Sequence, residues 1–137
     1  AAADVRSAWQ GRGAWGDETT AIYACSRINL GLLSEAGTGT VSGDLTTART
    51  WQIPASGGFM LHEDTADVRQ AFTADAEVGL FQGESDLAER VLYWLQHDDA
   101  RRTAAAQALH RCLRVPYTYA RAVTAILQFH QEMRGVD

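Results

Sequence analysis

The chain has 137 residues, 46% of them hydrophobic and 21% charged, a length that suits one domain and a composition that excludes a disordered chain. Its net charge of -5 argues against binding of nucleic acid or anionic membranes, and the lack of lysine among its 12 basic residues excludes a Walker A phosphate loop and a lysine nucleophile. No apolar run approaches the roughly 20 residues that a membrane span requires, so we expect none.

Apolar runs and helical patterns alternate along the first half of the chain. Short apolar runs bounded by loops predict buried strands at residues 27–33, 58–61 and 77–81. Apolar residues at helical spacing, with capping residues at the ends of the segments, predict helices between and after these strands. The expected helices cover residues 18–25, 46–55, 66–72, 84–97, 100–114 and 118–133.

This order of elements predicts an α/β fold. Strands that alternate with helices are joined by crossovers and therefore pair in parallel. We expect a parallel sheet of about three strands with helices on both faces and a helical C-terminus, which corresponds to part of a doubly wound fold. No linker or internal repeat divides the chain, so residues 1–137 are expected to form a single domain.

Cysteine and histidine residues give little indication of a metal site. Cys25 and Cys112 are far apart and are predicted to be reduced, half-buried thiols of a cytoplasmic protein. The four histidines show no metal-ligand spacing and are expected mostly at helix surfaces and ends, with His62 in a loop. The first 16 residues lack the basic and apolar regions of a signal peptide, which also favours a cytoplasmic location. We expect neither a metal nor a cofactor.

A candidate ligand site follows the first predicted strand, because open α/β sheets bind ligands at the carboxyl ends of their strands. Gly43 allows a close approach of the backbone, and the first N–H groups of the next helix favour an anion such as a pyrophosphate. Thr46 and Thr47 add hydroxyl groups, and Arg49 is placed to reach a phosphate or to serve as a surface arginine. Asp44 is placed to accept hydrogen bonds from sugar hydroxyls or to cap the helix.

The glycines of this loop also admit a second interpretation. Gly37, Gly39 and Gly43 lie between a strand and a helix, as in a dinucleotide-binding loop. The loop is too long for the tight turn of that motif, and the last glycine is out of register. A dinucleotide site is therefore the weaker alternative.

The segments YACSRINLGLL and TTARTWQIPASGGFMLHEDTADVRQAF resemble the nucleotide-sugar half of group 1 glycosyltransferases of the two-domain GT-B fold. They are most similar to the CgeB-like branch, which typically reads Arg-x-Phe-Glu-Ile-Pro-Ala-x-Gly-x-Phe-x-Leu in the second segment. The later PYTYARAV resembles a His-Thr-Tyr-x-x-Arg element, matched at Thr118 and Tyr119, with Arg121 one residue before the position of the element's arginine. The resemblance covers about residues 20–127 and implies a Rossmann-like donor-nucleotide-binding domain.

The resemblance also implies roles for individual residues. Members of that group bind the donor through a Glu-x7-Glu pair, the first carboxylate on the sugar and the second on the ribose diol. The corresponding residues here are Asp44 and Gln52, and Tyr117 replaces the usual histidine. By this resemblance, Asp44 contacts the sugar, Gln52 the ribose, and the segment from Gly43 to Arg49 the diphosphate.

We therefore expect a cytoplasmic glycosyltransferase part that transfers a hexosyl group from a nucleoside diphosphate sugar to an acceptor. The resemblance implies a missing N-terminal acceptor domain, so the chain is expected to be a truncated portion that is inactive alone. The alternative is a non-catalytic binding or interaction module with a degenerate donor site. We also expect a homodimer through the exposed edge of the first strand, which would bury Ile28, Leu30 and Leu32.

Overall fold

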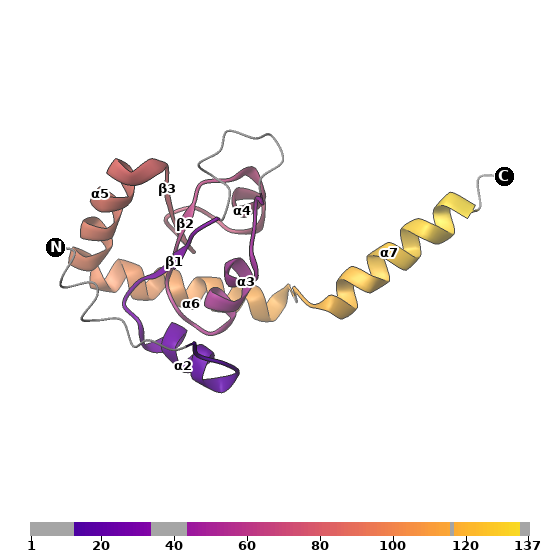
Figure 1. Cartoon of the computed structure of the whole chain (residues 1–137), viewed down its shortest axis with the longest axis horizontal. Coiled ribbons are helices and arrows are strands. Elements are labelled where there is room, and N and C mark those ends of the chain that lie inside the picture. Colours follow the sequence, from indigo (N-terminus) through magenta and orange to yellow (C-terminus); the bar gives the residue numbers. More distant parts are fainter. Residues whose placement is uncertain (1–12, 34–43, 116, 135–137) are drawn as a thin grey trace.

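The computed structural model of the chain describes residues 13–33, 44–115 and 117–134. In this part of the chain, helices and strands alternate up to the third strand and three helices follow (Figure 1). The nine expected segments are all present with the expected type. In chain order they are α2 (Asp17–Cys25), β1 (Asn29–Gly31), α3 (Ala48–Ala55), β2 (Met60–Glu63), α4 (Ala66–Ala71), β3 (Gly79–Phe81), α5 (Gly83–Gln96), α6 (Asp98–Arg114) and α7 (Tyr119–Arg134).

The three strands form one parallel sheet in the order β1-β2-β3. Leu30 lies opposite Leu61 across the first pair of strands, and Leu61 lies opposite Gly79 across the second. The helices α3 and α4 connect successive strands, so all three strands leave the sheet at the same edge. The predicted α/β class with a parallel sheet is confirmed.

Successive side chains of a strand point to opposite faces of the sheet. Apolar side chains on each of the two faces pack against helices. On one face, residues of β2 and β3 pack against α3, α4 and α6; the buried members of this core include Ile53, Met60, Val68, Phe72, Val78, Leu80 and Ala108. The other face packs against α5 and α6 through Phe59, Leu61, Phe81, Trp94, Ala104 and Ala105. The alanines of α6 contribute to both clusters. Helices on both faces are therefore confirmed.

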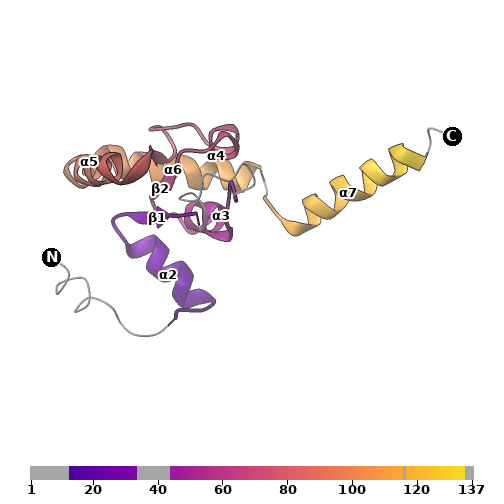
Figure 2. The ribbon, with the colours of Figure 1, turned by 45° about the horizontal axis from the view of Figure 1, so that its top comes forward.

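Helix α7 extends away from the body that the sheet and the other helices form (Figure 2). None of its residues is buried. Large apolar side chains remain exposed along it, among them Tyr119, Val123, Ile126 and Phe129. None of the helices in the described ranges has both the length and the apolar character needed to cross a membrane.

The second strand begins and ends two residues later than predicted. The apolar run ends at Leu61, but main-chain pairing continues: His62 lies opposite Gly31 on one side and Leu80 on the other. The placement of His62 in a loop was therefore wrong. A polar residue can occupy this buried strand position because both of its ring nitrogens have hydrogen-bonding partners.

The two cysteines are free thiols, as predicted, but they differ in environment. Cys112 is half-buried, and burial raises the pKa of its thiol. Cys25 is exposed rather than half-buried, because α2 buries none of its residues.

Candidate functional site

The carboxyl end of β1 is held by one side chain of β2 and one of α3. The Glu63 carboxylate, at the last position of β2, accepts a hydrogen bond from the backbone N–H of Leu33 at 2.7 Å. The Arg49 guanidinium, in the first turn of α3, donates to the carbonyl oxygen of Leu32 at 3.0 Å. The first turn of α3 is thereby fixed beside the carboxyl end of β1.

A threonine pair organises the beginning of α3. Thr47 is the N-cap residue, with extended backbone angles, and its N–H donates to the Thr50 hydroxyl at 2.9 Å. The N–H of Thr50 donates back to the carbonyl oxygen of Thr47 at 3.1 Å. Because the first N–H groups of a helix have no acceptor within it, this end of α3 offers donors and a partial positive charge to a ligand.

Most of the predicted site residues lie at this end of α3. Thr46 and Thr47 are half-buried, whereas Asp44, Arg49 and Gln52 are exposed. The side chains of Asp44 and Gln52 have no hydrogen-bonding partner in the part of the chain that is described. Gly43 lies outside the described residues. The arrangement leaves the polar groups of Asp44 and Gln52 accessible to a ligand.

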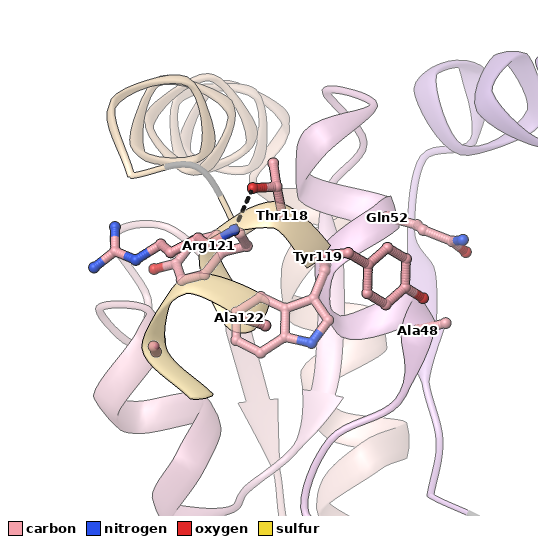
Figure 3. A pocket seen from close by; sticks show the side chains of 9 residues that line it. Ala48, Gln52, Thr118, Tyr119, Arg121 and Ala122 are labelled. Atoms are coloured by element: carbon pink, nitrogen blue, oxygen red, sulfur yellow. Dashed lines mark hydrogen bonds between the residues drawn. The ribbon is translucent and has the colours of Figure 1, made fainter. Parts of the chain in front are cut away.

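A cleft of about 680 Å³ opens between α3 and the beginning of α7. Trp51 lies in its wall, and Figure 3 shows Gln52 and Arg121 at opposite sides of it. The Thr118 hydroxyl accepts a hydrogen bond from the backbone N–H of Arg121 at 3.3 Å (Figure 3). Gln52 therefore borders an aromatic cleft with a cationic group on its far side.

Tyr117, which occupies the position of the usual histidine in the resembled family, lines this cleft. Its ring packs against Trp51 with 4.5 Å between centroids and against Phe72 with 6.0 Å. Its hydroxyl donates to the carbonyl oxygen of Ala71 at 3.2 Å. Tyr117 thus joins the segment before α7 to α3 and α4.

A second polar cluster follows β2 and β3. The Asp64 carboxylate accepts two hydrogen bonds from Arg69, at 2.5 and 2.6 Å, and one from the Gln82 amide at 2.8 Å. The hydrogen bonds from Arg69 are the main reason why the pKa of Asp64 lies below its ordinary value. The charges of Asp64 and Arg69 pair with each other, so this cluster stabilises the edge of the sheet. It therefore offers a ligand fewer free hydrogen-bonding groups than the N-terminus of α3 does.

His62 lies behind the beginning of α3 and is fully buried. Its Nε2 is 2.8 Å from the Thr50 hydroxyl and its Nδ1 is 2.7 Å from the carbonyl oxygen of Glu63. Burial lowers the pKa of His62 and Arg49 lowers it further, against the opposite effect of Glu63. The ring is therefore neutral at pH 7.

A family model described as glycosyl transferase-like matches residues 4–128. The chain belongs to this family. Comparisons with curated proteins and with solved structures gave no significant match. Membership in a glycosyl transferase-like family supports a transferase that acts on glycosyl groups, in agreement with the resemblance drawn from the sequence.

Two residues of this candidate site were not singled out by sequence reasoning, Trp51 and His62, and Tyr117 was noted only as the residue that replaces the usual histidine. Trp51 and Tyr117 meet only in the folded chain, and no spacing indicates their contact. For His62 a signal was present, because continued alternation along Met60, Leu61 and His62 places the histidine on the same face as Met60. Within the described residues, no three His, Cys, Asp or Glu side chains gather as metal ligands.

Proposed function

We propose that this chain forms the donor-binding part of a glycosyltransferase of the GT-B fold, similar to the CgeB-like branch. It binds a nucleoside diphosphate sugar and serves transfer of the hexosyl group to an acceptor. The observation that carries the proposal is the position of α3: its N-terminus lies at the carboxyl end of β1, within a chain of the glycosyl transferase-like family. Ligands of open α/β sheets bind at this edge.

The diphosphate binds at the first turn of α3. The N–H groups of this turn and the hydroxyl of Thr46 donate hydrogen bonds to the phosphate oxygens, whereas the predicted Thr47 hydroxyl is buried and does not face the ligand. One hydrogen bond of Arg49 goes to Leu32, which leaves further guanidinium donors for a phosphate. These cationic and dipolar groups stabilise the negative charge that develops on the leaving nucleoside diphosphate, without a metal ion.

Asp44 and Gln52 contact the sugar and the ribose. Asp44 has a short, exposed carboxylate just before α3, suited to accept hydrogen bonds from sugar hydroxyls. The amide of Gln52, one turn into the helix, accepts from one ribose hydroxyl and donates to another acceptor. The aromatic wall of Trp51 beside Gln52 supplies an apolar surface for the ring system of the nucleotide.

Amide chemical shifts measured during titration with UDP, GDP and NAD test this proposal. We expect UDP or GDP to shift the amides of Thr46, Thr47 and Arg49, and Arg49→Gln to weaken the response. Arg114→Gln, which changes an exposed arginine at the far end of α6, is the matched control and is expected to respond like the unchanged protein. A response to NAD alone would indicate a dinucleotide site, and no response to any of the three would contradict the proposal.

A non-catalytic interaction module is the alternative function. It is favoured by the exposed apolar residues beside β1, since Leu30 and Leu32 are 39% and 43% exposed. It is also favoured by Gln52, which lacks the charge of the glutamate that the resembled enzymes carry. Absence of nucleotide binding together with self-association would support this alternative.

A further inference from the structure

A chain of hydrogen bonds runs from β2 to the first turn of α3 through His62. The carbonyl oxygen of Glu63 can only accept, so the proton of the neutral ring resides on Nδ1 and is donated to that oxygen at 2.7 Å. Nε2 therefore accepts from the Thr50 hydroxyl at 2.8 Å. The same hydroxyl accepts from the N–H of Thr47 at 2.9 Å. Each donor in this series of hydrogen bonds has one acceptor, and only the Nδ1–H tautomer of His62 provides every donor with its acceptor.

The space for the ring is made by Gly31 on the neighbouring strand. A Cβ atom at Gly31 would lie 2.2 Å from Cδ2 of His62, so any larger residue there would displace the ring. Thr50 and His62 are both fully buried, so water does not replace a lost partner of the ring. The imidazole is thus fixed by β1 on one side and by α3 on the other.

Protonation would disturb this arrangement. A proton on Nε2 would face the Thr50 oxygen, and the hydroxyl hydrogen would then have to turn to another acceptor. The charged groups that act on the ring are Arg49 of α3 and Glu63 of its own strand, while Gly31 of β1 and Leu80 of β3 carry no charge. A buried imidazolium beside Arg49 is disfavoured, so the neutral form is the one that the fold holds.

We propose that His62 is a positioning residue, which in its neutral Nδ1–H form fixes the first turn of α3 through Thr50 and thereby sets the affinity of this turn for a diphosphate. The inference rests on the proposed function, since it is the diphosphate contact of that function that His62 controls. It predicts that nucleotide affinity falls when His62 becomes protonated, although His62 itself does not touch the nucleotide.

The sign of the pH dependence follows from the direction of the pKa shift. The pKa of His62 in the folded protein lies below 6.5, its ordinary value. The stabilising contribution of the neutral ring is therefore fully present above pH 6.5 and is lost as the pH falls through the lower, folded pKa. Nucleotide affinity is expected to follow the same course.

The first test needs no nucleotide. Long-range ¹H–¹⁵N NMR spectra of the histidine rings should show His62 as the Nδ1–H tautomer at pH 7.5. On acidification, the Thr47 amide should shift with the same midpoint as the His62 ring. An Nε2–H tautomer, or a Thr47 amide that ignores the His62 titration, would overturn the inference.

The second test measures UDP and GDP binding by calorimetry between pH 5 and pH 8. Thr50→Val removes the hydroxyl at nearly constant volume and should weaken binding about five- to tenfold at pH 7.5, the loss expected for one hydrogen bond. It should also abolish the pH step that matches the His62 midpoint. Thr50→Ser retains the hydroxyl and should keep that step, as should the control His110→Gln on α6.

The outcomes separate this inference from the proposed function. If neither UDP nor GDP binds to the unchanged protein, the proposed function fails, while the tautomer and the Thr47 amide still decide whether His62 positions α3. If a nucleotide binds and the pH step is the same in Thr50→Val, His62 does not act through Thr50. Should Thr50→Val not fold, the tautomer of His62 and the response of the Thr47 amide to the His62 titration, both measured on the unchanged protein, give the decision.

Discussion

Glu77 and Arg111 join the turn before β3 to α6. Nε of Arg111 donates to both carboxylate oxygens of Glu77, at 2.7 Å each. The backbone N–H of Thr73 donates to the same carboxylate at 2.7 Å. Glu77 is only 8% exposed, so its charge depends on these donors for compensation. The pair fixes the helix that packs on both core clusters.

Glu77→Gln is expected to lower the free energy of unfolding by about 1–3 kcal/mol, because it leaves the Arg111 guanidinium without its charged partner. Burial raises the pKa of Glu77, but the hydrogen bonds from Arg111 and Thr73 outweigh it and hold the pKa below its ordinary value of 4.5. The stabilisation is therefore present above about pH 4.5 and is lost as the pH falls through the folded pKa. Urea denaturation at pH 7 and pH 3.5 measures both effects.

The matched control for this change is Glu89→Gln, which alters an exposed glutamate on α5. It is expected to leave the urea midpoint nearly unchanged at both pH values. The difference between Glu77→Gln and the unchanged protein should shrink at pH 3.5. An equal difference at both pH values would show that charge pairing with Arg111 is not its cause.

Gly58→Ala is expected to destabilise the protein by about 1–3 kcal/mol through a steric conflict with α2. A Cβ atom at Gly58 would lie 2.3 Å from the carbonyl oxygen of Tyr23 and 2.8 Å from the Asn29 amide nitrogen. That amide nitrogen donates to the Tyr23 oxygen at 3.0 Å and to the Phe59 oxygen at 3.1 Å, so the junction has no spare volume. Thermal unfolding followed by circular dichroism measures the loss.

Gly57→Asn is the companion substitution, one residue earlier. Gly57 has a φ of +78°, which asparagine tolerates better than other residues, and a Cβ atom there would meet only Leu109 at 3.6 Å. We expect a smaller loss than for Gly58→Ala. The reverse order of the two melting temperatures would contradict the steric explanation.

Self-association through the edge of β1 remains a prediction. Within the described residues β1 pairs only with β2, and Leu30 and Leu32 are exposed beside the free edge. Two such edges would pair their N–H and C=O groups and bury these leucines. Sedimentation equilibrium up to roughly 100 μM should detect dimers, and Leu30→Lys should suppress them because an edge lysine opposes strand pairing.

The substitution Ile126→Lys on α7 distinguishes a dimer through the edge of β1 from a dimer through the exposed apolar residues of α7. Ile126 is 66% exposed on a helix without buried residues, so its replacement removes apolar area away from β1. It should leave the dimer unchanged if the strand edge is the interface. A clean monomer for the unchanged protein, or dimers lost only with Ile126→Lys, would contradict pairing through β1.

The sequence predicted the elements because each carries its own local signal. Apolar runs bounded by loops marked the strands, and the region around Thr46 and Thr47 marked the beginning of α3. The strand position of His62 was missed despite the alternation along Met60, Leu61 and His62, since a polar residue after an apolar run resembles the start of a loop until its partner Thr50 is known. The hydrogen bond of Arg49 to Leu32 could not be predicted either, because the sequence between these two residues does not indicate that they lie close together.

Only part of the candidate site was predictable from the sequence. The order of strand and helix predicted that Thr46, Thr47 and Arg49 lie beside the carboxyl end of β1, as they do, and binding of a ligand there stays a prediction. The aromatic cleft was not predicted, because the contact of Trp51 with Tyr117 joins α3 to a segment far along the chain. Local patterns specify where α3 begins, whereas long-range packing specifies which side chains surround that end.

Gln52→Glu tests the assignment of Gln52 to the ribose. A carboxylate accepts charge-assisted hydrogen bonds from both hydroxyls of the diol, whereas the amide has one acceptor oxygen and no charge. Charge-assisted hydrogen bonds contribute about 1.5–3 kcal/mol against about 1 kcal/mol for neutral ones, so the gain is on the order of 1 kcal/mol. Nucleotide binding should tighten about five- to tenfold, as measured by calorimetry with UDP or GDP.

The matched ligand control is a dideoxynucleoside diphosphate, which lacks the ribose hydroxyls. Gln52→Glu should not tighten its binding, because the added carboxylate has no diol to accept from. Repulsion between that carboxylate and the diphosphate acts on both ligands alike and is small when the two are more than about 7 Å apart in a solvated cleft. Equal effects on the two ligands would show that Gln52 does not contact the ribose, and the correspondence of Asp44 and Gln52 with the donor-binding pair would then fail as well.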